Sequence, residues 1–134
     1  MIEVTLSKLV IDENRQEQLV VLKEVNGDRS LPIVIGFMEA SSIKMKLADV
    51  EAPRPLTHDL IVSLLTYLEA DLDRFVIDDV HEGTFYAKLI LINNEDEEIA
   101  IDCRPSDGIA IALRMESPLF VESGLFEESA PLDD

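Results

Sequence analysis

The chain has 134 residues, of which 47% are hydrophobic and 29% charged, and 28 acidic against 11 basic residues give a formal net charge of −17. This length suits one soluble domain with its own core. No apolar run approaches the roughly 20 residues that cross a bilayer. The acidic excess argues against nucleic-acid binding driven by the phosphate backbone, because that binding draws its affinity from Lys and Arg.

The start of the chain has no basic segment followed by an apolar core, so we expect no secretory signal. Cys103 is the single cysteine, which excludes an intramolecular disulfide and a zinc site built from cysteines. We therefore expect a cytoplasmic protein that does not enter a membrane.

Apolar and polar residues alternate over residues 2–11, as they do in a half-buried strand. A second strand is predicted at 18–25, and a third at 31–36, which is short, β-branched and bounded by Gly36. The second and third are expected to form a hairpin across the turn signal at 26–28.

The spacing then becomes helical over residues 37–50 and again over 57–70. In the second of these segments Thr57 is a candidate N-cap. One apolar stripe runs along the same segment, the arrangement typical of a helix that packs on a core, and consists of Leu60, Ile61, Leu64, Leu65 and Leu68.

Strand patterns return at 74–81, 84–92 and 98–103, which we interpret as a meander. A third helix is expected at about 105–115, followed by a short strand at 117–122. The predicted fold is α+β, with a mainly antiparallel or mixed sheet and about three helices in the order βββ-αα-βββ-α, with one further strand. Residues 123–134 are expected to be an acidic, frayed tail.

The start of the third helix gathers polar groups. Pro105 suits a first helical turn, and Arg104 stands three residues before Asp107, within reach of a local pair. Two interpretations remain open at this point. An Arg–Asp pair at a helix start is common in structural roles, whereas free backbone N–H groups beside Arg104 can also form an anion-binding corner.

The segment at 102–114, DCRPSDGIAIALR, resembles the signature of the bifunctional nuclease domain family, D-x-R-P-S-D-A-I-A-L-A-L-R. Three further segments are similar to motifs of the same family: 31–43, 54–60 and 76–91. The resemblance covers residues 1–122 as one domain and leaves out 123–134. One departure is Gly108, where the family more often has Ala. Glycine lowers helix propensity by about 1 kcal/mol, and it also permits a closer approach of a partner or ligand.

The resemblance implies hydrolysis of DNA and RNA phosphodiester bonds, with DNA or RNA as the substrate. That chemistry needs an activated water and groups that stabilise negative charge. The motifs supply candidates for each role. The catalytic candidates are Glu39, His58, Asp59 and Asp107; the phosphate-binding candidates are Arg104, Ser106 and Arg114; the candidate metal ligands are Glu39, Asp59 and Asp107. Oxygen ligands favour a divalent cation such as magnesium or manganese.

The alternative is a non-catalytic module that binds an anion or a protein at the Arg104–Asp107 corner, and the acidic surface favours it. The two interpretations differ in space: the enzyme requires the candidates Glu39, His58, Asp59 and Asp107 to meet Arg104 in one cleft. Both allow a homo-oligomer, with a dimer as the default. A second cluster, at 77–83, is interpreted as a solvated sheet face, and Cys103 as a core residue at a strand end.

Overall fold

The computed structural model describes residues 1–12, 14 and 17–128. The predicted α+β fold with a mixed sheet is confirmed. Within these residues the elements follow the predicted order and end with one additional short helix: β1 Ile2–Val10, β2 Gln18–Glu24, β3 Ser30–Ile35, α1 Phe37–Leu47, α2 Thr57–Tyr67, β4 Asp71–His81, β5 Thr84–Ile92, β6 Glu98–Cys103, α3 Pro105–Arg114, β7 Leu119–Val121 and α4 Leu125–Glu128.

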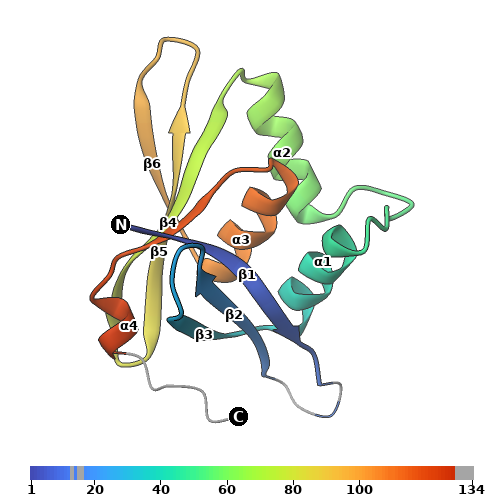
Figure 1. Ribbon diagram of the computed structural model, residues 1–134. Helices are drawn as coiled ribbons and strands as arrows, with labels where there is room; N and C mark the ends of the chain where they lie inside the picture. Colours follow the sequence, from blue (N-terminus) through green and yellow to red (C-terminus); the bar gives the residue numbers. More distant parts are fainter. Residues whose placement is uncertain (13, 15–16, 129–134) are drawn as a thin grey trace.

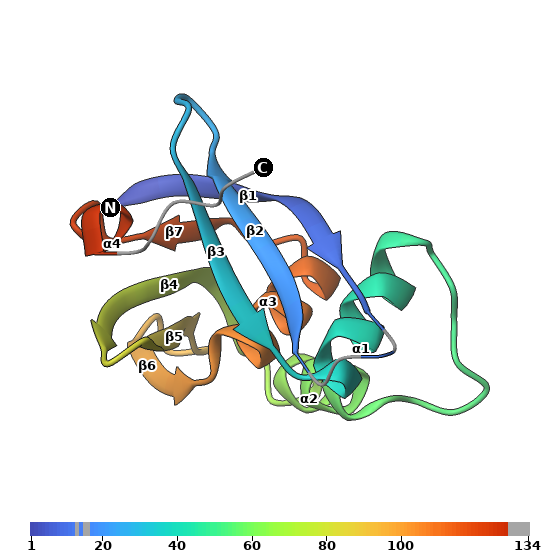
Figure 2. The same ribbon diagram turned by 90° about the horizontal axis from the view of Figure 1, so that it is seen from below.

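The seven strands form one sheet in the order β3-β2-β1-β7-β4-β5-β6. The short β7 holds it together, because it lies between two three-stranded meanders, antiparallel to β1 and parallel to β4. Figure 2 shows this arrangement from below, with β7 beside β1. The remaining neighbours pair antiparallel, including the predicted β2–β3 hairpin and the β4–β5–β6 meander.

Helix α3 is the central helix. It contacts α1 and α2 as well as β4 and β5, and Figure 1 shows α1, α2 and α3 gathered on one side of the strands. Its Ile109 is completely buried together with Phe75 of β4 and Ile43 of α1. Each such side chain stabilises the fold by about 1.5–3 kcal/mol relative to an exposed position. This packing fixes the first turn of α3 against its neighbours.

Only part of the apolar stripe predicted for α2 faces the core. Ile61 and Leu65 pack against the core, but Leu60, Leu64 and Leu68 are exposed, Leu68 by 71%. The segment is apolar around most of its circumference, so its spacing could not indicate which side would be covered. The described helices include none that is both long and apolar enough to span a membrane.

The predicted domain boundary at residue 122 lies too early. The residues that directly follow it were expected to be a frayed tail, and they pack on the domain instead. Leu125 and Phe126 of α4 are buried in the core, and the guanidinium of Arg29 lies 4.6 Å from the centre of the Phe126 ring. Packing of this kind is incompatible with a frayed tail, so the domain extends at least to residue 128. The rest of the predicted tail, 129–134, lies outside the described residues.

Candidate functional site

Three helices bring their polar residues to one pocket of about 620 Å³. Helix α1 contributes Glu39 from its first turn, α2 contributes His58, and Asp107 comes from the first turn of α3. Arg104 is the residue directly before α3 and occupies its N-cap position. Most of the candidates therefore meet in one pocket because the packing of α1 and α2 on α3 aligns the starts of these helices.

A continuous set of hydrogen bonds runs from the interior to this pocket. Arg114 Nη2 donates to Ser42 Oγ over 2.9 Å, and Ser42 Oγ lies 2.7 Å from Nδ1 of His58. Nε2 of the same ring lies 2.8 Å from Oδ1 of Asp107. The other carboxylate oxygen of Asp107 accepts from Arg104 Nε over 2.9 Å. Through Ser42 on one side and Asp107 on the other, the buried His58 therefore links the buried Arg114 to the exposed Arg104.

The neighbours of His58 determine the tautomer of its neutral ring. An ionised Asp107 can only accept, so Nε2 carries the proton. Nδ1 is then the acceptor, and the Ser42 hydroxyl donates a hydrogen bond to it. Both ring nitrogens of His58 are hydrogen-bonded within the protein. His58 is therefore better suited to positioning Asp107 than to taking a proton from a substrate.

The charges around Asp107 favour its ionised form. Burial opposes ionisation, yet the hydrogen bonds from His58 and Arg104 together lower the pKa of Asp107 below its usual value. For Asp59, the hydrogen bond from Arg114 lowers the pKa of the carboxyl group, against a smaller opposing effect of burial. Both carboxylates are therefore negative at neutral pH.

Arg104 is the exposed cation of the site. Its side chain is 68% exposed, and Nη2 lies 3.8 Å from Oε2 of Glu39. Glu39 makes no hydrogen bond to the described residues, so its carboxylate remains available to a ligand. Gly36 permits this placement, because a Cβ at that position would stand only 2.2 Å from Oε1 of Glu39.

Arg114 and Ser106 occupy places different from those predicted. The Arg114 side chain is only 8% exposed, and it bonds to Asp59 Oδ1 over 2.8 Å and to the carbonyl oxygen of Ala110 over 2.9 Å. Ser106 is buried. The structure therefore does not support phosphate binding by these two residues, since the Arg114 guanidinium is bonded within the protein and Ser106 is buried. Arg114 instead anchors Asp59 and Ser42.

Asp59 is the catalytic candidate that lies apart from the others. It faces a neighbouring pocket of about 540 Å³ with Lys46 and Glu51. Its Oδ2 accepts the backbone N–H of Leu56 over 2.9 Å. The N-cap of α2 is Leu56 and not Thr57 as predicted, and Asp59 accepts the N–H of this N-cap residue, as the third helical residue does in a capping box.

The predicted metal ligands do not form a shared site. Glu39 and Asp107 both face Arg104, while Asp59 pairs with Arg114 in the other pocket. Within the described residues no group of three or more His, Cys, Asp or Glu side chains is placed to hold a metal ion. As placed, Asp59 and Asp107 each accept a hydrogen bond from an arginine, and Glu39 lies 3.8 Å from Arg104, so the three carboxylates do not surround one common point.

The remaining predictions for polar residues agree with the structure. In the 77–83 cluster, His81 Nε2 lies 3.0 Å from Asp79 Oδ2, and both side chains are exposed. Cys103 packs against the core, and burial raises the pKa of its thiol to about 12. Sequence reasoning missed Ser42 and Gly36. The available signal was the position of Ser42, three residues after Glu39 on one helix, which places both on the same face.

Comparison with known proteins assigns the chain to a family. A model of the bifunctional nuclease domain matches residues 20–132. The match covers most of the chain, which therefore belongs to the bifunctional nuclease domain family.

An uncharacterized protein of Mycobacterium tuberculosis is 42% identical over 130 residues, which cover 97% of this chain and 77% of that protein. Bifunctional nuclease 1 of Oryza sativa subsp. indica is 30% identical over 118 residues, covering 84% of this chain and 35% of the rice protein. Bifunctional nuclease 1 of Arabidopsis thaliana is 29% identical over 133 residues, covering 86% of this chain and 40% of the plant protein. The plant relatives are thus much longer than the shared domain.

Proposed function

We propose that this protein is a nuclease that hydrolyses phosphodiester bonds of DNA and RNA at the Arg104 pocket. The observation that carries the proposal is the placement of one exposed guanidinium between two carboxylates at a pocket. Asp107 fixes Arg104 through Nε, which leaves the two terminal nitrogens to bind non-bridging phosphate oxygens. Preorganised cations of this kind stabilise the charge that develops during phosphoryl transfer.

Glu39 is the proposed general base, because its carboxylate has no hydrogen bond to the described residues and lies beside Arg104. Water is the nucleophile, since DNA offers no 2′-hydroxyl group. The water oxygen forms a bond to phosphorus while its proton passes to Glu39. The bond from phosphorus to the leaving sugar oxygen breaks, and solvent protonates that oxygen. His58 and Asp107 act as positioning residues that hold Arg104.

Three further predictions accompany this proposal. A need for magnesium or manganese is tested by activity with each ion and with a chelator, and no step above passes through a metal. A homo-oligomer, with a dimer as the default, is tested by sedimentation of the purified protein. A cytoplasmic location is tested by fractionation of cells.

The decisive experiment measures cleavage of labelled single- and double-stranded DNA and RNA by the wild type, Arg104→Ala and Glu39→Gln. The matched control is Arg74→Ala, which removes an exposed arginine that pairs with Asp73 and Glu98 outside the pocket. We expect the two site variants to lose about 10²-fold or more in kcat/KM and the control to keep its activity.

Equal activity in all four proteins would place the chemistry elsewhere or in a contaminant. A folded wild type without activity under any of these metal conditions would reject the nuclease proposal. The acidic surface would then favour the alternative function, a module that binds an anion or a protein at the Arg104–Asp107 corner. Binding of inorganic phosphate by the wild type, and its loss in Arg104→Ala, would support that module.

A further inference from the structure

The Arg104 pocket is apolar over most of its wall. Leu89 of β5 and Ile111 of α3 are buried at the wall, and the partly buried Met45 and Ile61 belong to α1 and α2. Ile101 of β6 lines the same pocket although it is 44% exposed. A concave, largely apolar surface with a few polar groups is the usual form of a site for a small organic group.

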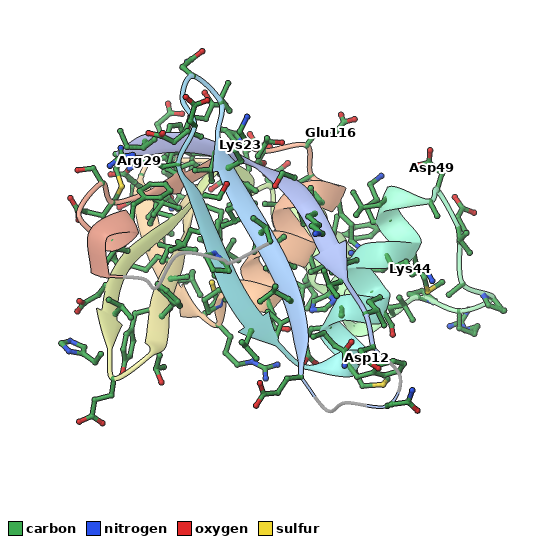
Figure 3. The ribbon with its side chains drawn as sticks, turned by 60° about the horizontal axis from the view of Figure 1, so that its bottom comes forward. Asp12, Lys23, Arg29, Lys44, Asp49 and Glu116 are labelled. Atoms are coloured by element: carbon green, nitrogen blue, oxygen red, sulfur yellow. The ribbon has the colours of Figure 1, made fainter. Side chains whose placement is uncertain are left out.

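The charge around this pocket is unfavourable for a long polyanion. Among the described residues that line it, Arg104 is the one Lys or Arg, and it is accompanied by the acidic residues Glu39, Asp102 and Asp107. Arg114 lies close to this pocket, but its side chain is buried and hydrogen-bonds to Asp59 and Ser42. Figure 3 shows Arg29 beside the β2–β3 turn and Lys44 on α1, far apart across the view. A row of phosphates would therefore find no matching row of cations.

Phosphate contacts alone consequently supply little affinity here. Each neutralised phosphate contributes a salt slope of only about −0.7 to −0.9 in log K against log salt. A substrate that binds at Arg104 must gain most of its affinity from another part, and the apolar wall is the surface next to that arginine. In a nucleotide, the part with a large apolar face is the base.

We propose that this pocket binds the nucleobase of the nucleotide whose phosphate contacts Arg104, so that the protein recognises one nucleotide unit at a time. This inference rests on the proposed function and names the part of the substrate that the site holds. The base faces contact Ile61 and Ile101, and the polarizable thioether of Met45 suits an aromatic ring. The pocket volume of about 620 Å³ lies within the range of sites for small organic ligands, about 300–1,000 Å³.

The test measures binding of three compounds to the folded full chain by calorimetry: adenosine 5′-monophosphate, adenosine and ribose 5-phosphate. We expect adenosine 5′-monophosphate to bind at least about tenfold more tightly than ribose 5-phosphate, since a buried apolar face is worth about one factor of ten or more. Adenosine should retain most of the affinity. Added salt should weaken binding of adenosine 5′-monophosphate by screening its phosphate from Arg104, and it should leave binding of the uncharged adenosine unchanged.

Two matched variants locate the binding. Ile101→Ser removes an exposed apolar side chain from the pocket, and Leu64→Ser removes one that is 52% exposed on α2 outside it. We expect the first to weaken binding of adenosine 5′-monophosphate by about three- to tenfold and the second to leave it unchanged. Both positions are exposed, so neither change disturbs the core.

The outcomes separate this inference from the proposed function. Equal affinity for adenosine 5′-monophosphate and ribose 5-phosphate, or equal effects of the two serine variants, would overturn the base pocket. Cleavage that depends on Arg104 together with no nucleotide binding would also overturn it while supporting the nuclease. Tight nucleotide binding that Ile101→Ser weakens, without cleavage of any substrate, would support the pocket and reject the nuclease.

Discussion

Gly108 of α3 and Phe75 of β4 are in direct contact, and the ring occupies the space that a side chain at position 108 would need. A Cβ added to Gly108 would stand 2.2 Å from Cε1 and 2.4 Å from Cδ1 of the ring. Phe75 is completely buried, so the ring has no free space into which to move. The departure from the alanine of the family signature is thus explained by a partner within this chain.

We expect Gly108→Ala to destabilise the protein. The methyl group gains about 1 kcal/mol of helix propensity, but overpacking a buried ring costs about 1–3 kcal/mol, so the net change is unfavourable. Urea unfolding measures it. The same substitution in a Phe75→Leu background should be neutral or stabilising, and a gain in stability in the wild-type background would contradict the proposed clash.

We expect Arg114→Met to lower the free energy of unfolding by about 1–3 kcal/mol, because loss of the buried guanidinium leaves the buried acceptor Ser42 without its donor. Ser42 and Asp59 lose their donor in this variant. The matched change Arg104→Met removes an exposed arginine and should cost at most about 1 kcal/mol. Similar losses in the two variants would show that Arg114 is not the anchor of the site.

The stability of the wild type should depend on pH through Asp107. Its folded pKa lies below the ordinary value of 3.8, so the ionised form stabilises the fold above that value. This contribution is lost as the pH falls through the lowered folded pKa. Asparagine does not titrate, so the Asp107→Asn variant lacks this pH-dependent contribution to stability. The difference in unfolding free energy between the two proteins should therefore shrink as the pH falls below about 4. A difference that stays constant down to the acid limit would contradict the lowered pKa.

Cys103 should react slowly with iodoacetamide in the folded protein. Its pKa of about 12 leaves about a thousandfold less thiolate at pH 8 than an ordinary cysteine near 8.5 has. Because the chain has a single cysteine, mass spectrometry follows the reaction directly. The protein unfolded in urea provides the control and should react at the ordinary rate, while rapid modification of the folded protein would contradict the raised pKa.

The neutral ring of His58 should carry its proton on Nε2. The chain has two histidines, so ¹⁵N NMR of the wild type and of His81→Gln assigns the signals of His58. We expect the Nε2–H tautomer, fixed by Ser42 on one side and Asp107 on the other. Ser42→Ala should increase the fraction of the other tautomer. A proton found on Nδ1 in the wild type would contradict this prediction, because Nδ1 would then donate to Ser42 and would not accept from it.

The sequence by itself determined the elements and most of the candidate polar groups. Local spacing suffices for this, since the alternation over residues 2–11 and the turn and helix-start signals at Gly83 and Pro105 each involve only a few neighbouring residues. The local pair of Arg104 with Asp107 was also predictable, because the two residues lie three apart.

Only the tertiary structure decided which of these groups work together. His58 meets Asp107 across 49 positions, and Arg114 meets Asp59 across 55. Such contacts arise from the packing of α1 and α2 on α3, and local spacing carries no information about that geometry. The same packing buried Arg114 and left Arg104 exposed. Two arginines of one helix region therefore acquired a structural role and a proposed phosphate-binding role, respectively.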